Sequence, residues 1–186
     1  MIIFLNGASS SGKTSLARAL QEAWDGPLIY WSLDHVISQL PFSYTGEGEY
    51  SKEGFELVST AIVAREHGYA LNDLSAAYIG QISGLGYDIV VDYVLLEETM
   101  LRPFVDNFRE IEVCFVGIDC QEDVIARRNE ARKDRAPGLS VPQRQSVHFC
   151  RSLYDLELDS TEKSPQALAH ILLNHIGSVP TTKGLA

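Results

Sequence analysis

The sequence contains few cysteines, and they follow none of the patterns in which cysteines bind zinc or form disulfide frameworks. Its 186 residues include three cysteines and no C-x-x-C pair. Closely spaced pairs are typical of zinc sites, and a dense, even set is typical of small secreted domains. The five histidines add no candidate metal site, because none pairs with another histidine or a cysteine at metal-ligand spacing.

Basic residues are also scarce. Lys plus Arg total 15 against 25 for Asp plus Glu, which gives a formal net charge of −10. A protein that mainly binds nucleic acid usually carries a basic face, so this balance argues against such a partner. No apolar run approaches the ~20 residues of a membrane span, and the N-terminus lacks the charged and apolar regions of a signal peptide. We expect a cytoplasmic protein with neither nucleic acid nor membrane as its partner.

What the sequence does contain is an alternation of short apolar runs with helical patterns. We expect strands at residues 2–5, 28–33, 88–92, 112–118 and 154–158. Helical patterns occupy residues 13–24, 71–84, 97–108, 121–133 and 165–176. Apolar strands that alternate with helices predict a parallel sheet covered on both faces.

Three regions do not fit this alternation clearly. Residues 41–54 resemble a loop, and residues 133–146, which are polar with two prolines, resemble a mobile segment. Residues 55–68 fit either a helix or a strand, and the sequence leaves that choice open. Hydrophobic residues make up 45% of the chain, which is enough for a sizeable core in one domain.

The strongest motif is GASSSGKT at residues 7–14, which matches G-x-x-x-x-G-K-[ST] in full between an expected strand and an expected helix. Glycines let the backbone curl so that its N–H groups face phosphate oxygens, and the helix adds its positive N-terminal end. Lys13 would supply charge to the β- and γ-phosphates, and the Thr14 hydroxyl would ligate Mg²⁺. The expected nucleotide contacts are Gly7, Ala8, Ser9, Ser10, Ser11, Gly12, Lys13, Thr14 and Ser15. The motif predicts ATP or GTP binding without choosing the base.

Two aspartates close expected strands. Asp34 and Asp92 should therefore face the cleft beyond the carboxyl ends of the sheet, where α/β proteins bind ligands. One would accept the proton of the attacking hydroxyl, and the other would hold a metal-bound water or the substrate. The alternative is that either aspartate is a helix N-cap, a position that favours Asp.

Arginines gather in the segment IARRNEARKDRAPG. Arg128, Arg132 and Arg135 have the spacing i, i+4 and i+7, which places them on one face of a helix. Arginines in this position are typical of a kinase lid that clamps the transferring phosphate. The alternative is a solvated helix on which Glu130 and Asp134 balance the charge.

Aromatic residues concentrate around Asp34. They would line a pocket for an apolar acceptor or pack in the core, and for Tyr30 and Trp31 on a strand we expect the core.

Five segments in order resemble the chloramphenicol phosphotransferase-like proteins, which are P-loop kinases related in fold to shikimate and adenylate kinases. The segments are IIFLNGASSSGKTSL, WSLDHVI, YDIVVDYVLL, ARRNEARKDRAPG and VHFCRSLYDLELDST. The resemblance implies that Asp34 is the base for the acceptor hydroxyl and that Arg128, Arg132 and Arg135 are lid arginines. Residues 41–70, where that kinase would contact its antibiotic, show little similarity. The resemblance therefore supports small-molecule phosphotransfer more than it supports chloramphenicol itself.

The prediction is an α/β P-loop kinase of nucleoside-monophosphate-kinase type, with a five-stranded parallel sheet, helices on both faces and an arginine-bearing lid. We expect one domain over residues 1–178, an acceptor-binding segment at about 41–70, a lid at about 128–146 and a flexible tail at 179–186.

The expected reaction moves the γ-phosphoryl group of ATP, with Mg²⁺, to a hydroxyl of a small molecule such as an antibiotic. A metabolite kinase and a nucleotide-gated binding module with slow hydrolysis are the alternatives. The expected catalytic residues are Asp34, Lys13, Arg132 and Arg135, while Arg128 binds the nucleotide and Asp92 joins Asp34 on the substrate side. The sequence leaves the oligomeric state open.

Overall fold

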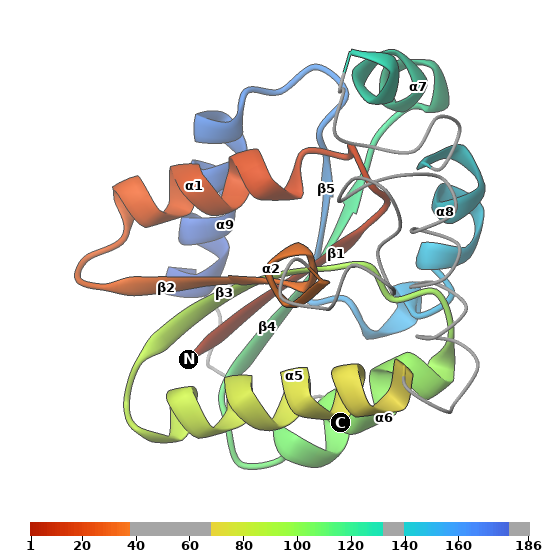
Figure 1. Cartoon of the computed structure of the whole chain (residues 1–186). Helices are drawn as coiled ribbons and strands as arrows, with labels where there is room; N and C mark the ends of the chain where they lie inside the picture. The colour runs from red at the N-terminus through yellow and green to blue at the C-terminus, as the bar shows by residue number, and fades with distance from the viewer. Residues whose placement is uncertain (38–67, 132–139, 179–186) are drawn as a thin grey trace.

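The computed structural model describes residues 1–37, 68–131 and 140–178, and its centre is a five-stranded parallel sheet (Figure 1). Its strands run in the order β2-β3-β1-β4-β5, and every neighbouring pair is parallel. The strands are β1 (Ile2–Gly7), β2 (Leu28–Ser32), β3 (Asp88–Tyr93), β4 (Val113–Asp119) and β5 (Leu156–Asp159). The predicted fold class is confirmed.

Helices cover both faces of this sheet. Figure 1 shows α1 (Lys13–Ala23) and α9 (Pro165–Ser178) together on one side, with α5 (Gly68–Gly84) and α6 (Glu98–Asn107) together on the other. Next to the end of β4 lie α7 (Glu122–Glu130) and α8 (Ser140–Val147). The short elements are α2 (Leu33–Ile37) and the 3₁₀ helix η1 (Arg151–Leu153).

The central strand β1 explains why two helical layers are needed. Successive side chains of a strand point to opposite faces, and all of β1 is buried. Phe4 packs with Phe104 of α6 on one face, whereas Leu5 packs with Leu16 of α1 on the other. A sheet that is apolar on both faces must be covered on both, as the alternation of strands and helices predicts.

The order of the strands sets the place of the site. Both neighbours of β1 come later in the chain, since β3 lies on one side and β4 on the other. The connection after β1 leads to β2 on one side, and the connection after β3 leads to β4 on the other. Both leave the same end of the sheet in opposite directions, and such a topological switch point is where these folds bind ligands.

The structure differs from the sequence-based expectations at two helices. Residues 140–146, expected to be part of a mobile segment, belong to α8, and Pro142 lies in its first turn, where the missing N–H costs nothing. The second strand ends at Ser32, so Asp34 belongs to the first turn of α2 rather than to the end of a strand. Residues 41–54 and nearly all of 55–68 lie outside the described residues.

Along the three described ranges, no helix combines the length and the apolar character that crossing a membrane requires.

Candidate active site

The glycine loop, residues 7–14, connects the buried strand β1 to α1. Gly12 is the N-cap of α1 and has φ +97°, a left-handed conformation that favours glycine. A side chain at Gly7 would place its Cβ 2.5 Å from the carbonyl oxygen of Ile118 in β4. Both motif glycines are therefore required by the path of the backbone, and the first N–H groups of α1 have no partner within the helix.

Lys13 lies folded against this loop. Its Nζ donates hydrogen bonds to the carbonyl oxygens of Gly7 at 2.9 Å and Ala8 at 2.8 Å. The same nitrogen is 3.7 Å from Asp92 Oδ1. A buried ammonium is stabilised by such an ion pair and by bonds to carbonyls, so a positive charge is fixed beside the glycine loop.

Asp92 lies within β3, next to β1, and is buried beneath the loop. Its Oδ2 accepts hydrogen bonds from Thr14 Oγ1 at 2.6 Å and from the Tyr30 hydroxyl at 3.2 Å. Burial, and next the charge of Asp92, raise the pKa of Tyr30. The phenol therefore stays protonated and donates a hydrogen bond to the carboxylate. Because Asp92 lies inside a strand, the alternative that it caps a helix is wrong.

Asp34 is half-buried and lies two residues after the end of β2, at the same end of the sheet. The N-cap of α2 is Ser32, whose Oγ accepts the His35 N–H at 3.4 Å. The helix-cap alternative for Asp34 is therefore wrong as well. Ser32 is the register partner of Asp92 across β2 and β3, so Asp34 lies two residues beyond the strand position beside Asp92.

Arg128 of α7 reaches the far side of the loop. Its Nη2 donates to the carbonyl oxygen of Ser160 at 2.9 Å, and the Ser160 hydroxyl donates to the Ser11 carbonyl at 2.6 Å. These bonds to the backbone near Gly12 do not fit a solvated helix face for Arg128. Arg132 and Arg135 lie outside the described residues, and their expected place in a lid stays a prediction.

Two residues that the sequence analysis did not single out also contact the loop. The Gln143 Oε1 of α8 accepts the Ser9 N–H at 2.9 Å. The Asn129 Oδ1 of α7 accepts hydrogen bonds from Ser10 Oγ at 3.4 Å and Ser140 Oγ at 2.9 Å. No short motif could reveal them, because they lie more than a hundred residues from the loop in sequence.

A buried polar network supports this side of the site. Asn6 Nδ2 donates to the Val147 carbonyl and to the Tyr154 hydroxyl, both at 2.9 Å. The Nδ1 of His148 is 2.9 Å from the same hydroxyl, and its Nε2 is 3.6 Å from Asp119 Oδ1. His148 thus joins α8 to the strand ends.

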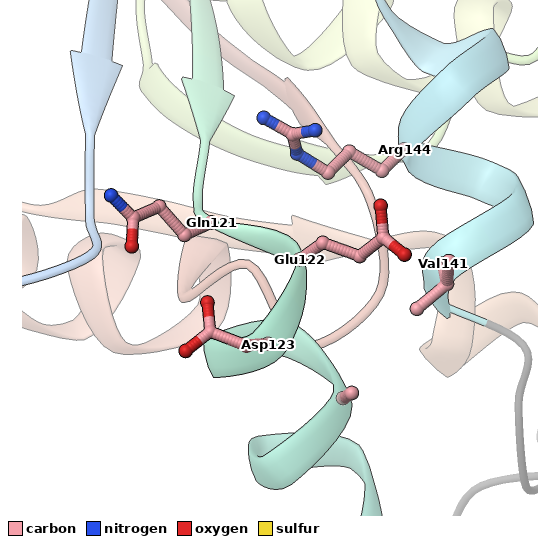
Figure 2. Close-up of a pocket in the computed structure, with 6 residues that line it drawn as sticks. Gln121, Glu122, Asp123, Val141 and Arg144 are labelled. Atoms are coloured by element: carbon pink, nitrogen blue, oxygen red, sulfur yellow. The ribbon is translucent and has the colours of Figure 1, made fainter.

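A separate pocket of about 560 Å³, open to solvent, lies between α7 and α8 (Figure 2). Its lining residues are Gln121, Glu122, Asp123, Ala126, Val141 and Arg144. Figure 2 shows Arg144 extending from α8 toward the segment before α7, where it forms an ion pair with Asp119 at 2.9 Å. None of these residues belongs to the glycine loop.

The loop fits a nucleotide and its metal chemically. The buried hydroxyls of Ser9 and Ser11 have no hydrogen-bond partner within the described ranges, and phosphate oxygens are suitable acceptors for them. Thr14 and Asp92 offer the hard oxygen ligands that Mg²⁺ prefers, usually one or two from the protein beside substrate phosphates. The described residues contain no group of three or more His, Cys, Asp or Glu side chains that would hold a metal alone.

Comparison with known proteins identifies the family of the chain. The sequence matches the family described as "Chloramphenicol phosphotransferase-like protein" over residues 1–177. The chain belongs to this family. Within the sequences compared, a protein from Mycobacterium tuberculosis (strain ATCC 25618 / H37Rv) named "Putative O-phosphotransferase Rv2636" is 29% identical over 191 residues, covering 92% of this chain and 80% of the relative.

Solved structures show the same fold. A sugar kinase from Janibacter sp. HTCC2649 superposes with a TM-score of 0.66 at 17% identity, covering 96% of this chain and 95% of that one. Shikimate kinase from Acinetobacter baumannii superposes with a TM-score of 0.59 at 16% identity, covering 95% and 93%. The fold is that of P-loop kinases, and together with the family it indicates a kinase-like phosphotransferase.

Proposed function

We propose that the chain transfers the γ-phosphoryl group of ATP to a hydroxyl group of a small molecule, with Mg²⁺ bound to the nucleotide. The observation that carries the proposal is the convergence of Lys13, Thr14 and Asp92 under the glycine loop. One positive charge, one hydroxyl and one carboxylate at a helix N-terminus are the parts that nucleotide phosphates and their metal require. The name of the mycobacterial relative, an O-phosphotransferase, supports a hydroxyl acceptor.

Each charged residue near the loop has a separate task in this proposal. Lys13 leaves the loop carbonyls to contact the phosphates, while the loop N–H groups orient the nucleotide. Thr14 and Asp92 hold the metal, which neutralises phosphate charge when it is bound. Arg128 borders the loop from α7 and binds the nucleotide.

Asp34 is the proposed base for the acceptor hydroxyl. It follows β2 at the carboxyl end of the sheet, next to the strand that carries Asp92. A carboxylate in that place accepts the proton as the hydroxyl attacks the γ-phosphorus. Arg132 and Arg135 are proposed to stabilise the charge that develops on the transferring group, and residues 41–70 are proposed to hold the acceptor.

A phosphotransfer screen tests the proposal. The full chain is incubated with γ-labelled ATP and Mg²⁺ against a panel of alcohols that includes chloramphenicol, sugars, nucleosides and cofactor precursors. Label on an acceptor, with ADP released only when that acceptor is present, is the expected result. ADP release that no acceptor stimulates would instead indicate a nucleotide-gated module that hydrolyses ATP slowly.

Lys13→Ala provides the matched test of the site. We expect the rate of transfer to fall by roughly 10²-fold or more, because the variant removes charge that stabilises the transferring phosphate. The control is Lys163→Ala, which removes an exposed lysine just beyond β5 and should leave the rate unchanged. Circular dichroism checks that both variants are folded. An active Lys13→Ala enzyme would contradict the proposed mechanism.

A further inference from the structure

The tip of the glycine loop, Ser9 and Ser10, is held from two sides by helices that come much later in the chain. Gln143 of α8 accepts the Ser9 N–H at 2.9 Å, and Asn129 of α7 accepts the Ser10 hydroxyl at 3.4 Å. Both holding side chains are themselves buried, with 8% of Gln143 and 4% of Asn129 exposed. The two side-chain amides therefore accept hydrogen bonds from adjacent residues of the loop, away from solvent.

The backbone at this tip needs such support. Ser10 has φ +62°, and it is the only non-glycine residue of the described ranges with a positive φ. This left-handed conformation brings Cβ close to the following carbonyl and is unfavourable for a residue such as serine. A residue remains in such a conformation only where its surroundings hold it there.

We propose that Gln143, through the Ser9 N–H, and Asn129, through the Ser10 hydroxyl, are positioning residues that keep Ser10 in the left-handed conformation and so keep the glycine loop in its phosphate-binding shape. The inference rests on the proposed function, because it concerns the same nucleotide site. Gln143 does not need to touch the nucleotide. It acts on the shape of the backbone, whose N–H groups must converge on one anion.

Gln143 is well placed for this role because α8 is fixed. Asn6 of β1 donates to the Val147 carbonyl at the end of α8 at 2.9 Å. Arg144, next to Gln143, donates to the Asp119 carboxylate at 2.9 and 3.0 Å. A side chain anchored in this way gives the loop a fixed reference, and a loop ordered before binding loses less entropy when the nucleotide arrives.

The experiment measures the dissociation constant for ATP with Mg²⁺ by calorimetry on the full chain. Gln143→Met keeps the volume and removes the acceptor, and loss of one buried hydrogen bond should raise the dissociation constant about tenfold. Ser10→Gly alone is measured as the reference for the double variant. In the double variant, glycine adopts φ +62° without cost, and affinity should return to within about threefold of that of Ser10→Gly. Gln145→Met, an exposed glutamine of the same helix, is the control and should bind as the wild type does.

Restoration by Ser10→Gly separates positioning from a general role in stability. If Gln143 only stabilised α8, a glycine in the loop would not restore binding to Gln143→Met. Unchanged ATP affinity in Gln143→Met, or a double variant as weak as Gln143→Met, would overturn the inference.

Amide hydrogen exchange without nucleotide keeps this test separate from the proposed function. Ser11 N–H donates to the Ala8 carbonyl at 3.2 Å inside the loop, so its protection reports the shape of the loop. Exchange at Ser11 should be faster in Gln143→Met and slow again in the double variant. If the wild-type chain binds no ATP while the variants show this pattern of exchange, the result would refute the proposed function and support the positioning role. Equal exchange in all variants would refute the positioning role whatever the chain binds.

Discussion

Thr14 and Asp92 are 78 residues apart in sequence, yet Thr14 Oγ1 donates a 2.6 Å hydrogen bond to Asp92 Oδ2. This bond joins the start of α1 to the end of β3 and fixes a hydroxyl and a carboxylate side by side under the glycine loop. Lys13 Nζ lies 3.7 Å from the other carboxylate oxygen. These contacts support the proposal that Asp92 serves the phosphates and metal rather than the acceptor alone.

The first prediction is that Asp92→Asn raises the Mg²⁺ concentration needed for ATP binding. The variant keeps the shape of the side chain and loses its negative charge. Loss of a group that supports a metal site typically costs about 10–100-fold in metal affinity. The control is Tyr30→Phe, which removes the 3.2 Å hydrogen bond to the same oxygen and leaves the carboxylate. Calorimetric titration with ATP across a series of Mg²⁺ concentrations measures the effect. An unchanged Mg²⁺ requirement in Asp92→Asn would mean that the carboxylate serves the substrate or the fold.

The second prediction concerns Gly117 of β4, against which the Tyr154 ring packs. An alanine Cβ would lie 2.2 Å from one ring carbon, and the Tyr154 hydroxyl is held by Asn6 at 2.9 Å. Because the ring cannot retreat easily, Gly117→Ala should lower the free energy of unfolding by about 1–3 kcal/mol or more. Gly177→Ala in α9 is the control, since no atom of the described residues, apart from its two chain neighbours and the backbone of α9 itself, lies within 4 Å of the position of its Cβ. Urea denaturation compares the two variants, and equal stabilities would show that the ring does shift.

Acid sensitivity gives the third prediction. The pKa of His148 is lowered from its ordinary value of 6.5, chiefly by burial, which outweighs the opposing effect of Asp119. As pH falls below about 6.5, the unfolded chain binds a proton that folded His148 does not. The stabilising contribution is therefore complete above pH 6.5 and is lost as pH falls toward the lower folded pKa.

His148→Gln should flatten the loss of stability below pH 6.5. Thermal or urea unfolding between about pH 5 and 7.5, where histidine titrates, measures it. The control is His170→Gln, an exposed histidine of α9 that should leave the slope unchanged. The same slope in His148→Gln and the wild type would show that other groups cause the acid sensitivity.

The fold was predictable because its signals are local. A strand such as β1 is apolar throughout, the motif that follows it has a fixed spacing, and the helix from Lys13 shows its buried face at regular intervals. α8 was missed because its sequence is polar with a proline. Two of its three buried residues, Ser140 and Gln143, are polar and form hydrogen bonds with Asn129 and Ser9, so α8 shows no apolar stripe.

The candidate site was predictable only in part, for the same reason. Lys13 and Thr14 follow from the motif, and Asp92 from the end of an apolar run. The contacts of Asn129 and Gln143 with the loop depend on how α7 and α8 pack, which no local pattern encodes. The sequence left open the alternative that Asp34 caps α2, because Ser32 and Asp34 are both good capping residues and only the backbone decides between them.

The last prediction is that Asp34→Asn lowers kcat by about 10²–10⁴-fold, the usual contribution of a general base, while ATP affinity barely changes. Asparagine keeps the shape of the side chain but cannot take the proton of the acceptor hydroxyl. Ser32→Ala is the matched control, because it removes the cap of α2 without touching the carboxylate. It should cost about 1 kcal/mol of stability and leave kcat nearly unchanged. Steady-state rates with the acceptor found in the screen, together with ATP titrations, measure both variants.

Three outcomes of that experiment have distinct meanings. A large loss of kcat with normal ATP affinity assigns the base to Asp34, because the carboxylate then acts only on the acceptor. A rate within about tenfold of the wild type is too small an effect for a general base and would refute the role. If affinity for ATP with Mg²⁺ collapses together with the rate, Asp34 belongs to the metal. Asp92, which accepts hydrogen bonds from Thr14 and Tyr30, would then be the better candidate for the base.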